Sequence, residues 1–363
     1  METLNAEREV ATLNGHTMTG GDGLGSYSRN SYYQRSIIDA AKLHIQRAVA
    51  ENLQPENFTT LETFSIADLG CSVGPNTFFA VQNILDAVKL KYKTHEPNTK
   101  IPEFQVLFND HSMNDFNTLF KCLPPNREYY ASAVPGSFYS RLFLRASVHF
   151  VHSSYSLHWL SQVPKEVINK NSPAWNKGKI HHTREEVTKE YSMQHAVDMA
   201  SFLSARADEV VPGGLVAIVI PARPNGIPHA QLPLNKKFDL FGSCLLELSN
   251  KGLINEEKVD LFNLPIYCTS PQELEAVIQQ NGCFSIESME SLPIVTAPST
   301  GFQDASMRLR AVTEELIREH FGPEILDELF NLFTNKLAEA HQDSASETIV
   351  NLFLLLKRKT YTN

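Results

Sequence analysis

A glycine-rich turn is the part of this sequence most suited to binding a ligand. The segment DLGCSVGPN begins at Asp68, directly after an apolar run, and leads into a helix predicted from Pro75. Gly70 and Gly74 permit a tight turn and a close approach of the backbone to a bound molecule. The first N–H groups of the following helix have no partner within that helix and can bind a polar ligand. The segment predicts a nucleotide-cofactor loop distinct from the GxGxxG and Walker A phosphate loops, with an ordinary turn as the alternative.

Two later segments could extend such a site. Asp110 ends the segment FND, where a carboxylate can accept both ribose hydroxyl groups of an adenosine, with a turn as the alternative. In VPGSFY, Ser137 and Phe138 would offer a hydroxyl group and a ring to an adenine. Taken alone, that segment is better explained as a Pro-Gly turn with a packed aromatic ring.

Three side chains gather where a fourth apolar run ends. Tyr155, His158 and Trp159 lie within five residues in the segment SSYSLHW. The indole N–H of a tryptophan donates from an apolar body, which suits an anionic oxygen in a dry pocket. A single histidine in such a place is more often a hydrogen-bonding residue than a catalyst. Gln34, at the end of a glycine-rich N-terminal segment, would by itself be an ordinary surface residue.

Short apolar runs alternate with helical stretches along the chain, which predicts an α/β fold with a mostly parallel sheet covered on both faces. The predicted strands are 64–69, 104–108, 129–134, 148–152, 215–220 and 349–356. The predicted helices are 31–51, 75–91 and 184–210, and the glycine pair at 213–214 is expected to separate the last helix from the next strand.

Three stretches do not follow the strand–helix alternation, namely 160–183, 230–264 and 298–340. We expect them to contribute to a helical cap, because pockets between a cap and the carboxyl ends of strands are where such folds bind ligands. The predicted division is an N-terminal arm (1–30) over the active site, an α/β core (31–229 and 265–363) and a cap formed by 230–264 with parts of 160–183 and 298–340. Candidate pocket walls are Phe238, Phe241, Tyr267, Phe302, Met307 and Phe333, of which about half would simply be core.

Composition argues against several classes of protein. The net charge of −9 disfavours non-specific binding to nucleic acid or to an anionic membrane. The five cysteines form no CxxC pair, and we expect neither a disulfide framework nor a structural zinc site. The sequence contains no HExxH or GxSxG motif and no apolar run long enough to span a membrane, and we expect no signal peptide. The expectation is a soluble cytosolic protein.

Taken in order, these motifs resemble the SABATH family of plant methyltransferases over essentially the whole chain. The resemblance is carried by GGxGxxSYxxNSxxQ, DxGCSxGPNT, FNDxxxNDFN, VPGSFY, SSYSLHWLSQVP, NKGKI and VDLFNLPIY. It implies a class I methyltransferase fold and S-adenosylmethionine as the methyl donor. The motifs are most similar to the loganate branch, although that branch carries a histidine near position 238 that is missing here.

The resemblance also implies roles for matching residues. The implied cofactor-binding residues are Tyr27, Ser31, Asp68, Gly70, Cys71, Asn76, Asp110, His111, Ser137, Phe138 and Ser154. The implied substrate-positioning residues are Gln34, Tyr155, His158 and Trp159. Some members of the family carry a magnesium ion, whose matching positions here are Asn176, Asp260, Phe262 and Asn263, and we expect any such ion to be structural. A homodimer is also implied.

The expected reaction is methylation of the carboxylate of a small plant metabolite acid, such as an iridoid, terpenoid or phenolic acid. A carboxylic acid with a pKa of about 4 is ionised at neutral pH and needs no general base. Catalysis then consists of positioning, with the Gln34 amide and the Trp159 indole as donors to the carboxylate and His158 as a third contact. The alternatives are an N-methyltransferase acting on a xanthine or an alkaloid, and a binding protein that retains the fold.

Overall fold

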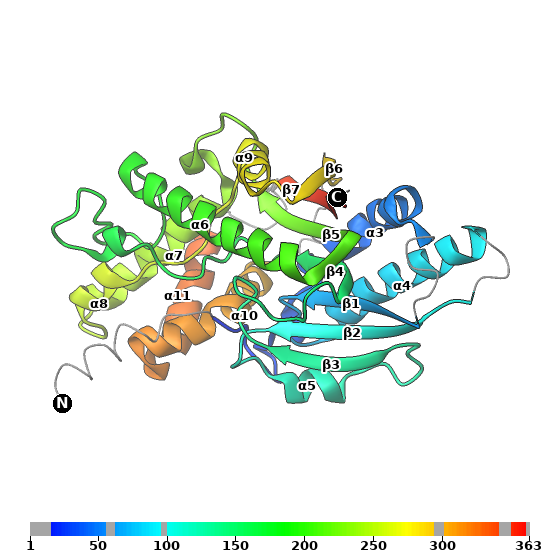
Figure 1. The fold of residues 1–363 in the computed structure, drawn as a ribbon. Helices are drawn as coiled ribbons and strands as arrows, with labels where there is room; N and C mark the ends of the chain where they lie inside the picture. The colour runs from blue at the N-terminus through cyan, green and yellow to red at the C-terminus, as the bar shows by residue number, and fades with distance from the viewer. Residues whose placement is uncertain (1–15, 56–61, 96–99, 294–300, 341–349, 361–363) are drawn as a thin grey trace, which may run out of the picture.

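A seven-stranded sheet forms the centre of the computed structural model, which describes residues 16–55, 62–95, 100–293, 301–340 and 350–360 (Figure 1). The strand order is β3-β2-β1-β4-β5-β7-β6. Strands β1 to β5 are parallel to one another, whereas β7 is antiparallel to both β5 and β6, which confirms the predicted mostly parallel α/β fold. The strands are β1 (Thr63–Leu69), β2 (Glu103–Asp110), β3 (Tyr130–Pro135), β4 (Val148–Ser154), β5 (Val210–Ala222), β6 (Phe284–Ser291) and β7 (Val350–Arg358).

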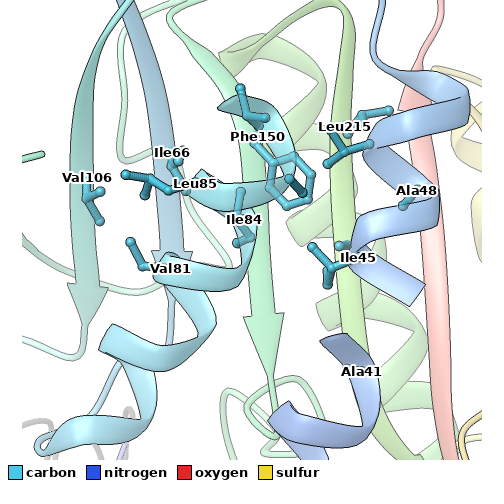
Figure 2. Packing of buried hydrophobic residues seen from close by; sticks show 14 of the residues in the cluster. Ala41, Ile45, Ala48, Ile66, Val81, Ile84, Leu85, Val106, Phe150 and Leu215 are labelled. Atoms are coloured by element: carbon cyan, nitrogen blue, oxygen red, sulfur yellow. The ribbon is translucent and has the colours of Figure 1, made fainter. Parts of the chain in front are cut away.

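One face of the sheet is covered by α3 (Tyr32–Asn52) and α4 (Pro75–His95). Figure 2 shows Ile45 of α3 and Ile84 of α4 pointing at Phe150 in the sheet, and all three side chains are buried. This layer places the glycine-rich turn at the start of α4 and Gln34 in the first turn of α3.

The opposite face is covered by α6 (Glu185–Glu209) and α9 (Pro271–Asn281), which bury residues such as Phe202 and Leu274 against the sheet. Because helices cover both faces, every residue of β1 after Thr63 is buried. The strand therefore lacks the alternation of exposed and buried residues that a half-buried strand shows.

The cap is a separate cluster of helices beyond one end of the sheet (Figure 1). Its helices are α7 (Pro233–Asn250), α8 (Glu256–Leu261), α10 (Phe302–Phe321) and α11 (Leu326–Glu339). They share a core of their own, in which the rings of Phe241 and Phe333 lie 5.2 Å apart. The exact division into arm, core and cap stays a prediction, and residues 1–15 and 298–300 lie outside the described residues.

Several elements differ from the sequence-based expectation. The pair Gly213–Gly214 lies inside β5 and does not separate it from the preceding helix. Glycine suits this position because a Cβ on Gly214 would approach the His149 carbonyl to 3.0 Å, where the β4–β5 register shifts. The sequence analysis missed α9 and the edge strand β6. The final strand is confirmed from Val350, in the interior of the sheet between β5 and β6, and Ile349 lies outside the described residues.

Shorter elements complete the fold. The segment NDFN begins a short helix, with the Asp115 side chain accepting from the Thr118 N–H at its N-terminus. Among the helices that the structure describes, none is long and apolar enough to cross a membrane. The short elements are α2 (Tyr27–Asn30), α5 (Phe116–Lys121) and the 3-10 turns Lys165–Ile168, His229–Gln231 and Pro323–Ile325.

Candidate active site

A pocket opens where the carboxyl ends of β1, β2 and β4 meet the cap and the N-terminal arm. The sequence analysis named ten of the residues that line it, from segments spread over the whole chain. These are Tyr27, Gln34, Gly70, Asp110, Phe138, Ser154, Tyr155, His158, Trp159 and Phe238. The carboxyl edge of a parallel sheet is the usual ligand site of such folds.

The two glycines of the turn are required by segments that approach them closely. Gly70 has a φ of +79°, and a Cβ placed there would lie well inside 3.0 Å of the Ser156 side chain. Gly74 has a φ of +101°, and a Cβ there would lie 2.8 Å from the Cβ of Ser28 in the arm. The turn therefore packs directly against the segment after β4 on one side and the arm on the other, and only glycine fits at both positions.

Asp68 lies behind this turn and not among the residues that line the pocket. Its Oδ1 is 2.6 Å from Nδ1 of His152 in β4, and its Oδ2 accepts a hydrogen bond from the Thr77 hydroxyl group in α4. The carboxylate is buried, and it ties β1 to the elements on either side. Its role as a cofactor-binding residue stays a prediction, and its contacts in this structure hold the turn in shape.

Asp110 faces the pocket from the end of β2. Its Oδ2 accepts from the Ser72 N–H and its Oδ1 from the His111 N–H, each at 2.7 Å. Burial raises the pKa of this carboxyl group to about 6, although the two N–H donors act in the opposite direction. Each oxygen keeps a lone pair, because a carboxylate can accept about four hydrogen bonds. The side chain is thus held in place to accept the paired hydroxyl groups of a ribose.

Backbone strain and a buried hydrogen-bond chain fix the wall that follows β4. Tyr155 has a φ of +57°, which is unusual for a bulky side chain and is often found at functional sites. Its hydroxyl group donates to Oδ1 of Asn351 in β7 and lies 3.4 Å from the hydroxyl group of Tyr33. The carbonyl of Trp159 accepts from the Tyr139 hydroxyl group at 2.6 Å. The rings that face the pocket are therefore positioned from behind.

Three polar atoms of the lining residues are buried and have no hydrogen-bond partner among the described residues: Oε1 of Gln34, Oγ of Ser72 and Nδ1 of His158. Buried polar atoms in native proteins nearly always have a partner, so these three atoms are exceptions in this structure. Burial, together with the smaller effect of His195, lowers the pKa of His158 to about 3. His158 is therefore neutral at physiological pH.

The remaining predicted cofactor residues lie near the pocket without lining it. The Asn76 amide donates to both the hydroxyl group and the carbonyl of Ser31, at 2.9 and 3.0 Å, so these two side chains hold α3 and α4 together. Cys71 is buried, and Ser137 accepts from the Tyr139 N–H at 3.2 Å. The contacts of these residues in this structure are with other protein groups, and the His111 N–H likewise donates to the Asp110 carboxylate.

The four residues implied for magnesium lie away from the pocket. The Asn176 amide donates to Oδ1 of Asn263 at 2.8 Å, which uses one of the oxygens that the ion would need. Asp260 is the one carboxylate of the set, 4.0 Å from the Lys177 amine, and Phe262 could offer only its carbonyl. No three His, Cys, Asp or Glu side chains gather as metal ligands in the described parts of the chain. This arrangement does not fit the octahedral oxygen shell of magnesium.

Further lining residues come from the arm and the cap. On α10 they recur at helical spacing, as Ala305, Arg308, Leu309 and Val312, and on α7 Lys237 precedes Phe238. Of the six apolar wall candidates, Phe238 lines the pocket, whereas the other five do not. Helical spacing was the only sequence signal, and it does not tell which neighbour a helix face meets. The other missed residues are His16, Met18, Tyr33, Ser72, Ser156, Pro221, Leu234 and Ile266.

Comparison with known proteins gives a consistent result. Residues 14–359 match the family described as SAM dependent carboxyl methyltransferase. The chain is 50% identical to a loganic acid O-methyltransferase of Catharanthus roseus, over 95% of this chain and 94% of the relative. It is 48% identical to a farnesoic acid carboxyl-O-methyltransferase of Arabidopsis thaliana, over 76% of this chain and 79% of the relative. A solved loganic acid methyltransferase with SAH superposes with a TM-score of 0.90, at 50% identity, covering 94% of this chain and 99% of that one.

Proposed function

The chain belongs to the family of S-adenosylmethionine-dependent carboxyl methyltransferases, and from this premise we propose how its pocket performs the transfer. The enzyme transfers a methyl group to the carboxylate of a small acid, as its resemblance to the SABATH family predicts. The pocket has a cofactor end beside the glycine-rich turn and an acceptor end beside the cap.

At the cofactor end, the residues present fit S-adenosylmethionine. The Asp110 carboxylate would accept the ribose hydroxyl groups, and the Phe138 ring would cover the adenine. The close approach of Ser156 to Gly70 leaves no room for a side chain in the turn itself, so the ligand would meet backbone there. When bound, the donor supplies a methyl group already activated by its positively charged sulfur, so the protein need not generate an electrophile.

At the acceptor end, the amide of Gln34 and the indole N–H of Trp159 would hold the carboxylate, with Tyr155 and His158 beside it. These neutral donors can orient an oxygen without neutralising its charge. Fixing the reacting oxygen in line with the methyl group accounts for several kcal/mol of barrier lowering. The cap and arm would exclude water from the reacting oxygen.

One observation supports a carboxylate as the acceptor: the described residues that line this end of the pocket include no general base. His158, with its pKa near 3, is a weak proton acceptor, and the only carboxylate is Asp110 at the cofactor end. A base works best when its pKa lies near the working pH. An acceptor that is already ionised suits this pocket, whereas a xanthine N–H would first have to lose its proton.

The direct test incubates the purified enzyme with labelled S-adenosylmethionine and a panel of acids, with xanthines alongside. The panel contains loganate, farnesoate, salicylate, jasmonate, indole-acetate, gibberellin and cinnamate. Ester formation with an acid supports the proposal. Label on a xanthine nitrogen alone would assign the pocket to N-methylation. Binding of S-adenosylhomocysteine without any transfer would assign it to a binding protein.

The remaining proposals concern assembly and location. A homodimer in the cytosol is supported by the family resemblance, and we retain the arm, core and cap as the working division of the chain. The magnesium ion is implied by the resemblance alone, and the contact between Asn176 and Asn263 argues against it. Sedimentation velocity would test the homodimer. Because the Asn176 amide faces Asn263, we expect magnesium to leave both the melting temperature and turnover unchanged.

A further inference from the structure

One segment that reaches both ends of the pocket has no regular secondary structure of its own. Residues 136–147 join β3 to β4 and form neither helix nor strand. The segment carries Phe138, which lines the pocket, and Tyr139, whose hydroxyl group donates to the Trp159 carbonyl. Buried backbone N–H and C=O groups need partners, and a segment outside helices and strands must find them elsewhere. The shape of this segment therefore depends on the side chains behind it.

Arg206 holds the first half of the segment from the last turn of α6. Its guanidinium group is 0% exposed and donates through Nε to Oε2 of Glu209 at 2.7 Å. The two terminal nitrogens also donate to the carbonyls of Phe138 and Ser140, at 2.9 and 3.0 Å. A guanidinium group is planar and presents its donors in a fixed fork, so these contacts define where the two carbonyls lie.

Glu209 holds the second half of the same segment. Its side chain is also 0% exposed, and Oε1 accepts from the N–H groups of Leu142 and Phe143. The Glu209 carbonyl accepts from the N–H of Ser147, where the segment passes into β4. One buried ion pair thus supplies partners to backbone groups along most of the connection between β3 and β4.

Stability alone is a weak explanation for this pair. Removing two charges from water costs about as much as their attraction in the interior returns, so apolar packing could fill the same space at similar stability. Apolar side chains could not hold the backbone of residues 138–143, because they offer neither donors nor acceptors. The shape of the segment is the property that requires Arg206 and Glu209.

The shape of the segment matters at both ends of the pocket. The rings of Phe138 and Tyr139 lie edge to face, 4.8 Å apart, and the Tyr139 hydroxyl group is 2.6 Å from the Trp159 carbonyl. The same helix α6 holds the chain just beyond, because Oδ2 of Asp198 accepts from the Ser161 N–H at 2.8 Å. A displacement of the segment would therefore move Phe138 and release one of the contacts that fix Trp159.

We propose that Arg206 and Glu209 are positioning residues, which set the Phe138 ring against the adenine and, through Tyr139, set the place of Trp159 at the acceptor end. This inference rests on the proposed function, which assigns Phe138 to the adenine. Neither Arg206 nor Glu209 is among the described residues that line the pocket, so any effect on the reaction must pass through the segment that they hold.

The first test is Arg206→Lys, which keeps a charge beside Glu209 but loses the planar fork. Affinity for S-adenosylhomocysteine should fall about tenfold in calorimetry, within the range for stacking of one base on an aromatic ring. Arg358→Lys is the matched control, because Arg358 also donates to two carbonyls, those of Ala207 and Cys283, and does not line the pocket. The control should lower the melting temperature and leave the affinity unchanged.

A second variant separates positioning from stability. Arg206→Met combined with Glu209→Gln removes both buried charges, and the glutamine keeps an oxygen for the N–H groups of Leu142 and Phe143. The double variant should unfold at a higher temperature than Arg206→Met alone, because no buried charge is left unpaired. Its affinity for S-adenosylhomocysteine, measured well below the melting temperature, should stay about tenfold low. Wild-type affinity in this variant or in Arg206→Lys would refute the inference.

A double-mutant cycle with Phe138→Ala tests the route. Arg206→Lys should weaken S-adenosylhomocysteine binding in the wild-type background and have little further effect beside Phe138→Ala, whereas additive losses would contradict the inference. If Phe138→Ala weakens binding and Arg206→Lys does not, the inference fails and the proposed function stands. If Phe138→Ala leaves the affinity unchanged, the proposed adenine contact is wrong and the inference fails with it.

Tyr139→Phe tests the link to the acceptor end, because it removes only the hydroxyl group that donates to the Trp159 carbonyl. Affinity for S-adenosylhomocysteine should stay unchanged, while kcat/KM for the acid that the panel identifies should fall about threefold to tenfold, as expected for one neutral hydrogen bond. An unchanged kcat/KM would refute the part of the inference that concerns Trp159.

Discussion

Replacing Gly70 by alanine tests the close packing on which the cofactor end depends. Alanine in the left-handed conformation that Gly70 adopts is unfavourable by about 1–2 kcal/mol. The new Cβ would also overlap both Cβ and Oγ of Ser156, so either the turn or the segment after β4 must move. Overpacking of this kind adds about 1–3 kcal/mol. The expected total loss in the free energy of unfolding is about 2–5 kcal/mol.

Gly226 provides the matched control, because it has a φ of +78° and its Cβ would meet no atom within 4 Å. Gly226→Ala should therefore show only the conformational part of the loss, about 1–2 kcal/mol. A second comparison adds Ser156→Gly to Gly70→Ala, which removes both overlapping atoms and should restore most of the difference between the two alanine variants.

The assay combines urea unfolding with calorimetric titration of S-adenosylhomocysteine. A turn displaced by about 1 Å should lower kcat/KM of Gly70→Ala by about a hundredfold, whereas Gly226→Ala should retain wild-type binding and turnover. The reasoning is refuted if Gly70→Ala binds the cofactor product as tightly as wild type and loses no more stability than Gly226→Ala.

Three further predictions follow from the pocket and its surroundings. Asp110 has a pKa raised to about 6, so it is progressively protonated below that pH; S-adenosylhomocysteine affinity should fall between pH 7 and pH 5 in calorimetry, and Asp110→Asn should bind weakly at both pH values. Burial lowers the pKa values of His195 and His229 from 6.5 to about 4, so the stability that the neutral side chains confer is complete above pH 6.5 and is lost as the pH falls toward 4. At pH 5.5 each histidine should lower the free energy of unfolding by about 1 kcal/mol, and His229→Gln should therefore flatten the pH dependence of the urea midpoint. Gln34→Ala and Trp159→Ala should each lower kcat/KM about tenfold to a hundredfold while S-adenosylhomocysteine binds as before; unchanged turnover in both would remove them from the acceptor site.

Local sequence was sufficient for most of the sheet. The strands that became β1, β4 and β7 are largely apolar runs that are buried on both faces, so composition alone marked them. The edge strand β6 was missed because only its first residue, Phe284, is buried, which leaves no comparable pattern. The turn at Gly70 was recognised from its glycines, because the requirement for a left-handed backbone is a local property.

The tertiary structure decided which distant residues each of these side chains contacts. The steric reason for Gly70 is Ser156, which is 86 residues away in the chain, and the two partners of Asp68 are His152 and Thr77. No local pattern records such pairs, because strand order and register bring them together.

The same distinction applies to the acceptor end. Helical spacing in the cap identified apolar faces, but it did not distinguish residues of the cap core from residues of the pocket. Phe241 and Phe333 pack within the cap, whereas Phe238 lines the pocket. Helical spacing also gave no role to Lys237 and Arg308. Periodicity fixes which residues share one face of a helix, and the packing of that helix against the rest of the molecule decides what the face meets. The sequence thus indicated the reaction and its cofactor, and only the folded chain brought together the segments of the arm, the sheet and the cap that line the pocket.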